Sequence, residues 1–401
     1  MDKGLEKKYK DYFASPYLVW VFMWVNAIKD IALFVDGPDC NFFRVDMIYK
    51  THDLFSILKD SSINTRLYFS WVMPNKMVLW YEDKIKRKIW FIEKNNKFQL
   101  GVITNMPVTS LLGIQYDWII IDFNKKYLIV PSYTDKFWID WYSLFLREIA
   151  KKIDLENKKQ KTQKSISIIW YLFDRNEWDN FWNIEELKRL MELIWVEINS
   201  IWLNWWNFDE LKKVEESELL VVLPYWKYAW KVLKKRLQVD ILELEVPFWL
   251  RNTIDFIKRI WEKLNINLDF VEEIIEKEVK KIKNKTDLLN EKIFLDKNFI
   301  YAWDPNLESW IKDFADFLWM NLIKSFSYNW DKIFYDEIDK EKIDFIIWNS
   351  EFNLENKKKI EFSFPCYNAH FLTNRAFIWF KWVLNFIERL YNELIKTKDA
   401  K

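Results

Sequence analysis

Two short segments of the chain carry the residue types best suited to binding a metal or moving a proton. The first is the turn Gly37-Pro38-Asp39-Cys40, which directly follows a run of apolar residues. A thiolate at the end of a buried strand can serve as a ligand for a metal cluster, and Asp39 would add an oxygen ligand. A lone cysteine is more commonly a small buried apolar residue, and aspartate is also favoured at helix N-caps. Both interpretations of the turn stay open.

The second segment, FPCYNAHF, contains Cys366 and His370 and lies between an apolar run and the last predicted helix. Histidine suits ligand or proton-donor work near neutral pH, and open α/β sheets bind ligands in the loops that follow their strands. The alternative is an ordinary loop histidine with a structural hydrogen bond. The other histidine, His52, fits a helix surface. We take Cys366 and His370 as candidate catalytic residues.

The composition excludes several classes of protein. A net charge of +1 gives no basic footprint for nucleic acid, and two cysteines fit a reducing cytoplasm better than a disulfide framework. The N-terminus lacks the apolar core of a signal peptide, and the longest apolar run, residues 17–25, is far shorter than a membrane span of about 20 residues. No Walker or dinucleotide-binding pattern occurs. We expect a cytoplasmic protein without a membrane anchor or a nucleotide site of its own.

The chain has only 4 glycines but 26 tryptophans. Together they make up about 7.5% of the residues, close to the roughly 7% glycine of an average protein. Tryptophan also stands after predicted strands and at helix ends, where glycine is favoured because positive φ angles suit a residue without Cβ. We interpret most of these positions as UGA codons read as glycine in the source, with Trp118 the best candidate for a true tryptophan. The alternative is a genuinely tryptophan-rich chain.

The elements that must position these residues form three α/β blocks. In the first block, apolar runs predict strands at residues 31–35, 66–70, 99–103, 118–122 and 127–131. A polar linker is predicted at 158–164, after which strands and helices alternate, and a third block ends in a helix near 379–396. Such alternation predicts parallel sheets covered by helices on both faces. We therefore predict three Rossmann-like, doubly wound domains at residues 1–157, 165–285 and 290–401.

Three motifs follow one another along the chain once tryptophan is read as glycine. They are the helix, strand and turn of residues 20–45; Val246-Pro247-Phe248-Trp249 with Thr253 and Phe256; and the segment from Phe364 to His370 followed by Trp379-Phe380-Lys381-Trp382. They resemble the Gly-Pro-Cys turn, the Pro-x-Gly…Thr…Phe segment and the Phe-Pro…His…Gly-Tyr-x-Gly ending of nitrogenase component 1-like oxidoreductases. That family includes nitrogenase subunits, cofactor-assembly scaffolds and dark-operative protochlorophyllide reductase.

The resemblance implies a [4Fe-4S]-type iron–sulfur cluster at an interface between two homologous subunits. It assigns Cys40, with Asp39 beside it, to the cluster, and it places Cys366 and His370 at the substrate cleft. The family typically supplies three cysteines per cluster-binding subunit, whereas Ser15 and Met106 stand near the other two positions here. The family's acidic pair after Leu112-Gly113 is also replaced. The resemblance therefore implies that Cys40 is a single ligand lent to a heterodimer.

We accordingly expect an oxidoreductase subunit, the ligand-poor half of an ATP-coupled low-potential reductase or of a cofactor-assembly complex. Its expected partners are a homologous three-cysteine subunit and an ATP-dependent iron–sulfur reductase that delivers electrons. The alternative is a degenerate, non-catalytic paralogue that keeps the fold as a binding or scaffold protein.

Overall fold

The structure is a computed structural model of the 401-residue chain. It describes residues 17–38, 45, 56, 58, 66–71, 81–95, 97–132, 138–156, 160–169, 177–204, 206–226, 228–303, 308–327, 339–348, 354, 356–362, 373 and 375–396. The chain divides into two compact units. The first comprises Met1–Gln163, Ser167–Phe173 and Asn199–Ile241, and the second comprises Lys164–Ile166, Asp174–Ile198 and Leu242–Lys401.

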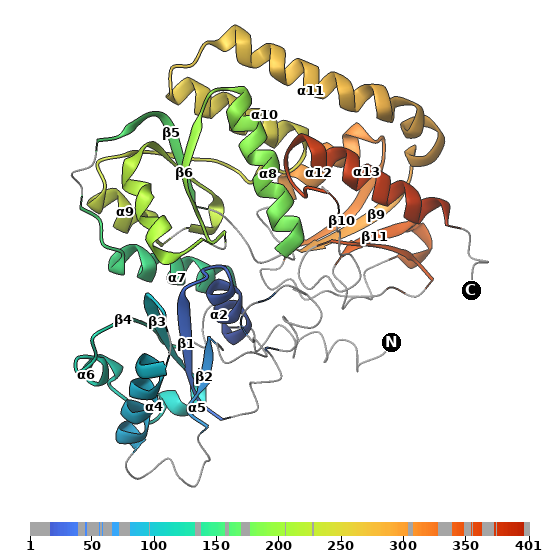
Figure 1. Cartoon of the computed structure of the whole chain (residues 1–401). Coiled ribbons are helices and arrows are strands. Elements are labelled where there is room, and N and C mark those ends of the chain that lie inside the picture. The colour runs from blue at the N-terminus through green and yellow to red at the C-terminus, as the bar shows by residue number, and fades with distance from the viewer. Residues whose placement is uncertain are drawn as a thin grey trace. The chain divides into compact units, whose positions relative to one another are not determined.

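Twelve described strands form three four-stranded sheets (Figure 1). The strands are β1 Ile31–Asp36, β2 Leu67–Phe69, β3 Leu100–Asn105, β4 Lys126–Val130, β5 Thr162–Ile169, β6 Glu197–Trp202, β7 Ser217–Val222, β8 Asp240–Glu243, β9 Asn298–Trp303, β10 Asn321–Ser327, β11 Phe345–Trp348 and β12 Lys358–Glu361. Their orders are β2-β1-β3-β4, β6-β5-β7-β8 and β10-β9-β11-β12. Each sheet thus repeats one doubly wound order, with its first strand between its second and third.

Helices connect and cover these sheets. They are α2 Tyr17–Asn26, α4 Tyr81–Asn95, α5 Pro107–Ser110, α6 Tyr116–Ile120, α7 Trp138–Lys152, α8 Glu177–Leu193, α9 Trp230–Arg236, α10 Trp249–Lys263, α11 Leu268–Leu289, α12 Glu308–Phe317 and α13 Trp379–Ile395. Shorter turns are η4 Phe208–Glu216, η5 Pro224–Trp226, η6 Asn290–Phe294 and η9 Lys340–Lys342. Neighbouring strands of the first and third sheets pair in parallel. The predicted α/β class with Rossmann-like parallel sheets is confirmed.

The first sheet is built around β1, whose six residues are all buried. Its central position explains the uninterrupted apolar run, because a parallel strand with helices on both faces has no side facing water. The preceding helix α2 is buried from Leu18 to Asn26. The Arg66 guanidinium donates to the carbonyls of Val25 and Ile28, at 2.9 and 2.6 Å, and so satisfies acceptors at the end of α2. Arg66 also donates to the carbonyl of Ile31 at 3.4 Å, so one guanidinium bridges the end of α2 and the start of β1.

Two local predictions were wrong. Residues 118–122 were predicted as a strand, but 116–120 form α6, with Ile119 buried and Trp118 76% exposed. A short apolar run does not distinguish a strand from a helix, and here the burial follows helical spacing. Residues 162–164 were predicted as linker, but β5 begins at Thr162 and extends its polar, exposed end beyond the buried part of the sheet.

The predicted domain ranges, 1–157, 165–285 and 290–401, remain a proposal. One sheet falls in each range, except that β5 starts slightly before the second. None of the described helices is long and apolar enough to cross a membrane.

Candidate functional site at the carboxyl edge of the first sheet

The strand order of the first sheet marks one place where a ligand is expected. The chain leaves β1 toward β2 on one side and later adds β3 on the other side. In doubly wound sheets this reversal opens a crevice at the carboxyl ends of the two central strands. The crevice of the first sheet therefore lies between the ends of β1 and β3, where Asp36 and Gly37 face Asn105 and Met106.

Asp36 ends β1 with a carboxylate that is completely buried. The phenols of Tyr81 and Tyr116, the first residues of α4 and α6, each donate a hydrogen bond to one of its two oxygens. A buried carboxylate is costly unless hydrogen bonds replace its hydration, and two phenols supply part of that replacement. The same contacts anchor the beginnings of both helices to the end of β1.

The backbone at this point is held as firmly as the side chain. The Asp36 carbonyl accepts the Met106 N–H at 2.9 Å and the Thr109 hydroxyl at 2.7 Å. The next residue, Gly37, donates its N–H to the Ser70 hydroxyl at 2.9 Å, and Ser70 donates to the Gly37 carbonyl at 3.2 Å. The end of β1 is thus tied to the ends of β2 and β3 immediately before the turn that leads to Cys40.

Polar contacts continue across the edge toward β4. The Asn105 side chain donates to the Ser110 hydroxyl at 2.8 Å and accepts the Ser132 N–H at 2.9 Å. The hydroxyls of Ser110 and Ser132 are 2.8 Å apart, and the Tyr17 phenol donates to the Asn105 carbonyl. All four strands of the first sheet are therefore followed or ended by a hydrogen-bonded polar residue.

The electrostatics of this edge suit a structural role for the two tyrosines better than acid–base catalysis. Burial raises the pKa of both the Tyr81 and the Tyr116 phenol well above its ordinary value, and the neighbouring Asp36 carboxylate raises it further. Both phenols therefore stay protonated at any physiological pH and remain donors to Asp36. The cluster can fix the end of β1, but the two tyrosines are not suited to act as bases.

The edge fits the implied iron–sulfur cluster only in part. Met106 stands near the family's third cysteine position, and its thioether packs on Gly37 so closely that a Cβ built there would lie 2.5 Å from Met106 Cγ and 2.6 Å from Sδ. A thioether is a weak replacement for the thiolates that hold such clusters. The described residues of this edge contribute no thiolate, so we derive no reaction step through a cluster.

The predicted site residues Cys40, Asp39, Cys366 and His370 all lie outside the described residues, as do His52 and Ser15. Among the described residues, no three His, Cys, Asp or Glu side chains are grouped to hold a metal ion. The sequence-based prediction missed Asp36 and its two tyrosines. The available signal was that polar residues end or follow the strands of a predicted parallel sheet.

In the second unit, hydrogen bonds and ion pairs fix the start of α13, which follows Cys366 and His370 along the chain. The Asn183 side chain accepts the Phe377 N–H at 2.5 Å. The carboxylate of Glu186, which is completely buried, contacts the ammonium of Lys381 at 2.8 Å and the guanidinium of Arg189 at 2.6 Å. Arg189 lies in α8 together with Glu186, so it is the ion pair with Lys381 that links α8 to α13.

Comparisons with known proteins agree with this architecture. The family model described as nitrogenase component 1 type oxidoreductase matches residues 21–335. The solved structure titled "Nitrogenase Cp1 at pH 6.5" superposes with a TM-score of 0.78 at 14% identity, covering 97% of this chain and 94% of that one. The structure titled "Nitrogenase Cp1 at pH 5" gives 0.68 at 12% identity, covering 93% and 87%. These two similarities concern the fold alone. No curated protein sequence matches the chain.

Proposed function

Because this chain belongs to the nitrogenase component 1 type oxidoreductase family, we propose that it is the ligand-poor subunit of an ATP-coupled low-potential reductase or of a cofactor-assembly complex. In this proposal Cys40 lends one ligand to a [4Fe-4S]-type cluster at the interface with a homologous three-cysteine subunit. An ATP-dependent iron–sulfur reductase delivers the electrons, and the complex works in the cytoplasm. Cys366 and His370 face the substrate, which is unsaturated or tetrapyrrole-like.

One observation carries the proposal. The Gly37–Pro38 turn leaves the carboxyl end of β1 at the switch point of the first sheet, inside the region that matches the family. Hydrogen bonds with Ser70, Met106 and Thr109 fix the backbone just before that turn. A metal ligand needs such support, because a site is only as well placed as the groups that hold it.

Iron content tests the ligand role of Cys40. We expect the chain to purify without iron when it is expressed alone, and to carry a cluster when it is co-expressed with a three-cysteine homologue. Cys40→Ala should lower the iron content of that complex, whereas Cys366→Ala should leave it unchanged and serve as the matched control. A complex whose iron content does not depend on Cys40 would contradict the ligand role.

The second candidate is a non-catalytic scaffold, and the position of Met106 favours it. The Met106 thioether fills the space beside Gly37, and the resemblance places the family's third cysteine near Met106. A cluster-free chain that still binds the homologous subunit in size-exclusion chromatography, with no iron in the complex, would support the scaffold and contradict the first proposal.

We also propose that most tryptophan positions are glycine in the native protein. Five described tryptophans have positive φ angles: Trp71, Trp195, Trp249, Trp319 and Trp379. An L-residue in this region costs about 1 to 2 kcal/mol, which glycine avoids. Other tryptophans are buried with an indole nitrogen that finds no hydrogen-bond partner among the described residues, namely Trp24, Trp226, Trp261, Trp310 and Trp382.

Mass spectrometry of peptides from the native source tests this proposal directly. We expect the mass of glycine at most of the 26 positions. Tryptophan masses throughout would contradict the recoding and leave the strained positions as features of a tryptophan-rich chain.

A further inference from the structure

One short helix of the first unit carries a concentrated positive charge. Residues 227–236, KYAWKVLKKR, contain five cations and no carboxylate, in a chain whose net charge is only +1. Most of this stretch forms α9, whose first turn holds no acidic residue. Lysine in the last turn of a helix suits the negative end of the helix dipole, but Lys231 in the first turn does not. The helix dipole therefore accounts for only part of this charge.

Contacts on one side hold α9 in a fixed orientation. Ala229, Leu233 and Leu237, spaced four residues apart, are buried. Arg236 donates from its guanidinium to carbonyls at the end of α7, including that of Ile153 at 2.7 Å. This bond satisfies an acceptor beyond the last turn of α7. The opposite side of α9 therefore faces solvent.

Three lysines occupy the solvent-facing side of α9, and we call them the lysine face. Lys231, Lys234 and Lys235 are spaced by three and four residues, which places them on one face of the helix, and all three are exposed. Lys231 and Lys234 lie over the ring of Trp230, at 6.0 and 5.4 Å from its centroid. None of the three makes an ion pair with a described residue. Like charges at these spacings repel, so the face gains from an external anionic partner.

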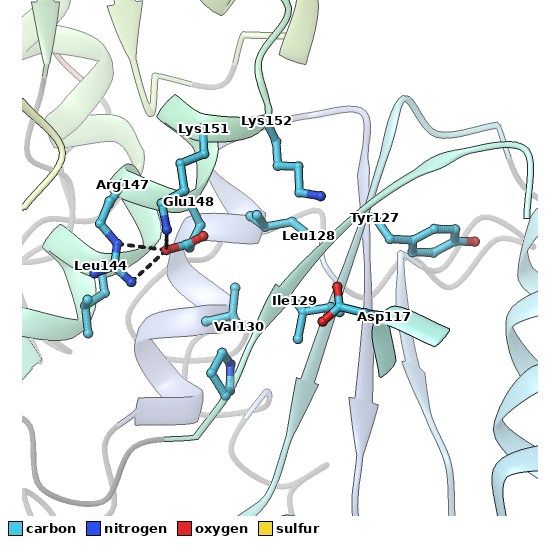
Figure 2. Close-up of a pocket in the computed structure, with 11 residues that line it drawn as sticks. Asp117, Tyr127, Leu128, Ile129, Val130, Leu144, Arg147, Glu148, Lys151 and Lys152 are labelled. Carbon is cyan, nitrogen blue, oxygen red and sulfur yellow. Dashed lines mark hydrogen bonds and ion pairs between the residues drawn. The ribbon is translucent and has the colours of Figure 1, made fainter. Parts of the chain in front are cut away.

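The cations at the end of α7 differ from the lysine face. Figure 2 shows a groove of about 340 Å³ between α7 and β4. Arg147 and Lys151 both contact the Glu148 carboxylate there, at 2.7 and 2.8 Å, and Asp117 adds a second carboxylate to the lining. The charges of this groove are thus largely matched within the chain, whereas those of the lysine face are not.

Carboxylates on a protein helix fit the lysine face better than other polyanions do. DNA-binding proteins commonly make about 6 to 10 phosphate contacts, whereas this face offers three lysines. Helices that lie on membranes carry apolar residues beside their cations, and no large apolar residue of α9 is exposed. Residues at spacings of three and four share a face on any helix, so carboxylates at that spacing match the three lysines.

We propose that the lysine face of α9 docks an acidic helix of a partner protein. The partner helix carries carboxylates along one face, and these pair with Lys231, Lys234 and Lys235. Electrostatic attraction steers the partner to α9 and sets its orientation, and added salt weakens the contact because the lysines are exposed. This docking surface is independent of the cluster chemistry proposed above.

Fluorescence anisotropy with the isolated full-length chain tests the proposal. The probe is a labelled, alanine-based helical peptide with glutamates at spacings of three and four residues, so that they line one face. The comparison is an isomer of the same composition with its glutamates spread around the helix. We expect the one-faced peptide to bind, the isomer to bind about threefold more weakly, and added salt to weaken both.

Triple variants of the lysine face locate the site. Lys231→Gln, Lys234→Gln and Lys235→Gln together should weaken binding of the one-faced peptide about tenfold, because three charge contacts are lost. Lys231→Arg, Lys234→Arg and Lys235→Arg together keep the charge and should keep the binding. Loss of binding in the arginine variant would contradict a contact based on charge.

A triple variant of α11 is the matched control. Lys277→Gln, Lys280→Gln and Lys283→Gln together remove the same charge from exposed positions of α11, and binding should stay within about twofold of the parent. Equal losses in both glutamine variants, or no binding of the one-faced peptide, would overturn the proposal. Tighter binding of a duplex oligonucleotide or of anionic phospholipid vesicles, lost in the α9 glutamine variant, would also overturn it by assigning the face to another partner class. Iron content of the co-expressed complex is measured separately, so failure here does not depend on the proposed function.

Discussion

The first and third sheets share one strand order but are completed by opposite chemistry. At the end of β1, the buried Asp36 carboxylate is held by two phenols. Beside the third sheet, aromatic rings from α12, from α13 and from Phe362, the residue after β12, pack against one another. Trp310 lies 5.6 Å from Phe362, and Trp382 lies 4.6 Å from Phe386, measured between ring centroids.

The two regions differ in whether their buried polar groups have hydrogen-bond partners. In the first sheet, each polar group at the strand ends described above has a hydrogen-bond partner. Beside the third sheet, the indole nitrogens of Trp310 and Trp382 are buried, and no described atom accepts their hydrogen bonds. A satisfied polar network is a specific structural feature, whereas unsatisfied buried donors cost about 1 to 3 kcal/mol each. Under the recoding of tryptophan proposed above, the aromatic region carries foreign bulk, whereas the hydrogen-bonded residues around Asp36 include no tryptophan.

The largest expected effect comes from removing the centre of the polar network. Asp36→Ala leaves the phenols of Tyr81 and Tyr116 buried without an acceptor, and we expect a loss of about 3 kcal/mol in the free energy of unfolding. Asp36→Asn keeps one acceptor oxygen and should lose about 1 to 2 kcal/mol. Urea denaturation followed by circular dichroism measures both values. A variant Asp36→Ala as stable as the parent would show that the network is not a stabilising element.

Alkaline pH should weaken the first region through the same residues. The pKa of each phenol is raised in the folded state, so above the ordinary value of 10.0 the folded state holds protons that the unfolded chain releases. Stability is fully present below that pH and falls above it, by about 1.4 kcal/mol per tyrosine at pH 11. Tyr81→Phe and Tyr116→Phe should each flatten the dependence of the unfolding free energy between pH 9 and 11. Parallel curves for variant and parent would contradict this account.

Much of the fold was readable from the sequence, whereas the site was not. A continuous run of apolar residues predicts a buried strand such as β1, because both faces of a central parallel strand are covered. The Asp36 cluster has no local pattern, since Tyr81 and Tyr116 are 45 and 80 residues away. Short apolar runs were ambiguous too, and α6 was mistaken for a strand for that reason. Long-range hydrogen bonds and short amphipathic turns become visible only when the chain is folded.

Backbone conformation separates two exposed tryptophans. Trp319 follows α12 with a φ of 56°, and the next residue, Met320, donates its N–H to the Ala315 carbonyl at 2.9 Å, as in a glycine-ended helix. Trp90 lies inside α4, where glycine is unfavourable. The two residues are similarly exposed, Trp319 at 51% and Trp90 at 56%. We expect Trp319→Gly to stabilise the chain by about 0.5 to 1 kcal/mol and Trp90→Gly to destabilise it by a similar amount. Thermal denaturation distinguishes the signs, and equal signs would show that bulk rather than φ decides the outcome.

The smallest expected effect concerns a second tie between the same two helical segments that Asp36 joins. Lys86 of α4 contacts Asp122, just beyond α6, at 3.1 Å, but both side chains are largely exposed. Water and salt screen this pair, and holding two long side chains costs entropy, so such pairs contribute about 0 to 1 kcal/mol. Lys86→Ala should therefore change the free energy of unfolding by less than about 0.5 kcal/mol, and added salt should remove the difference. If Lys86→Ala lowered the free energy of unfolding as much as Tyr81→Phe, burial would not explain the strength of the contacts to Asp36. The energetic contrast between satisfied and unsatisfied buried groups would then have no support.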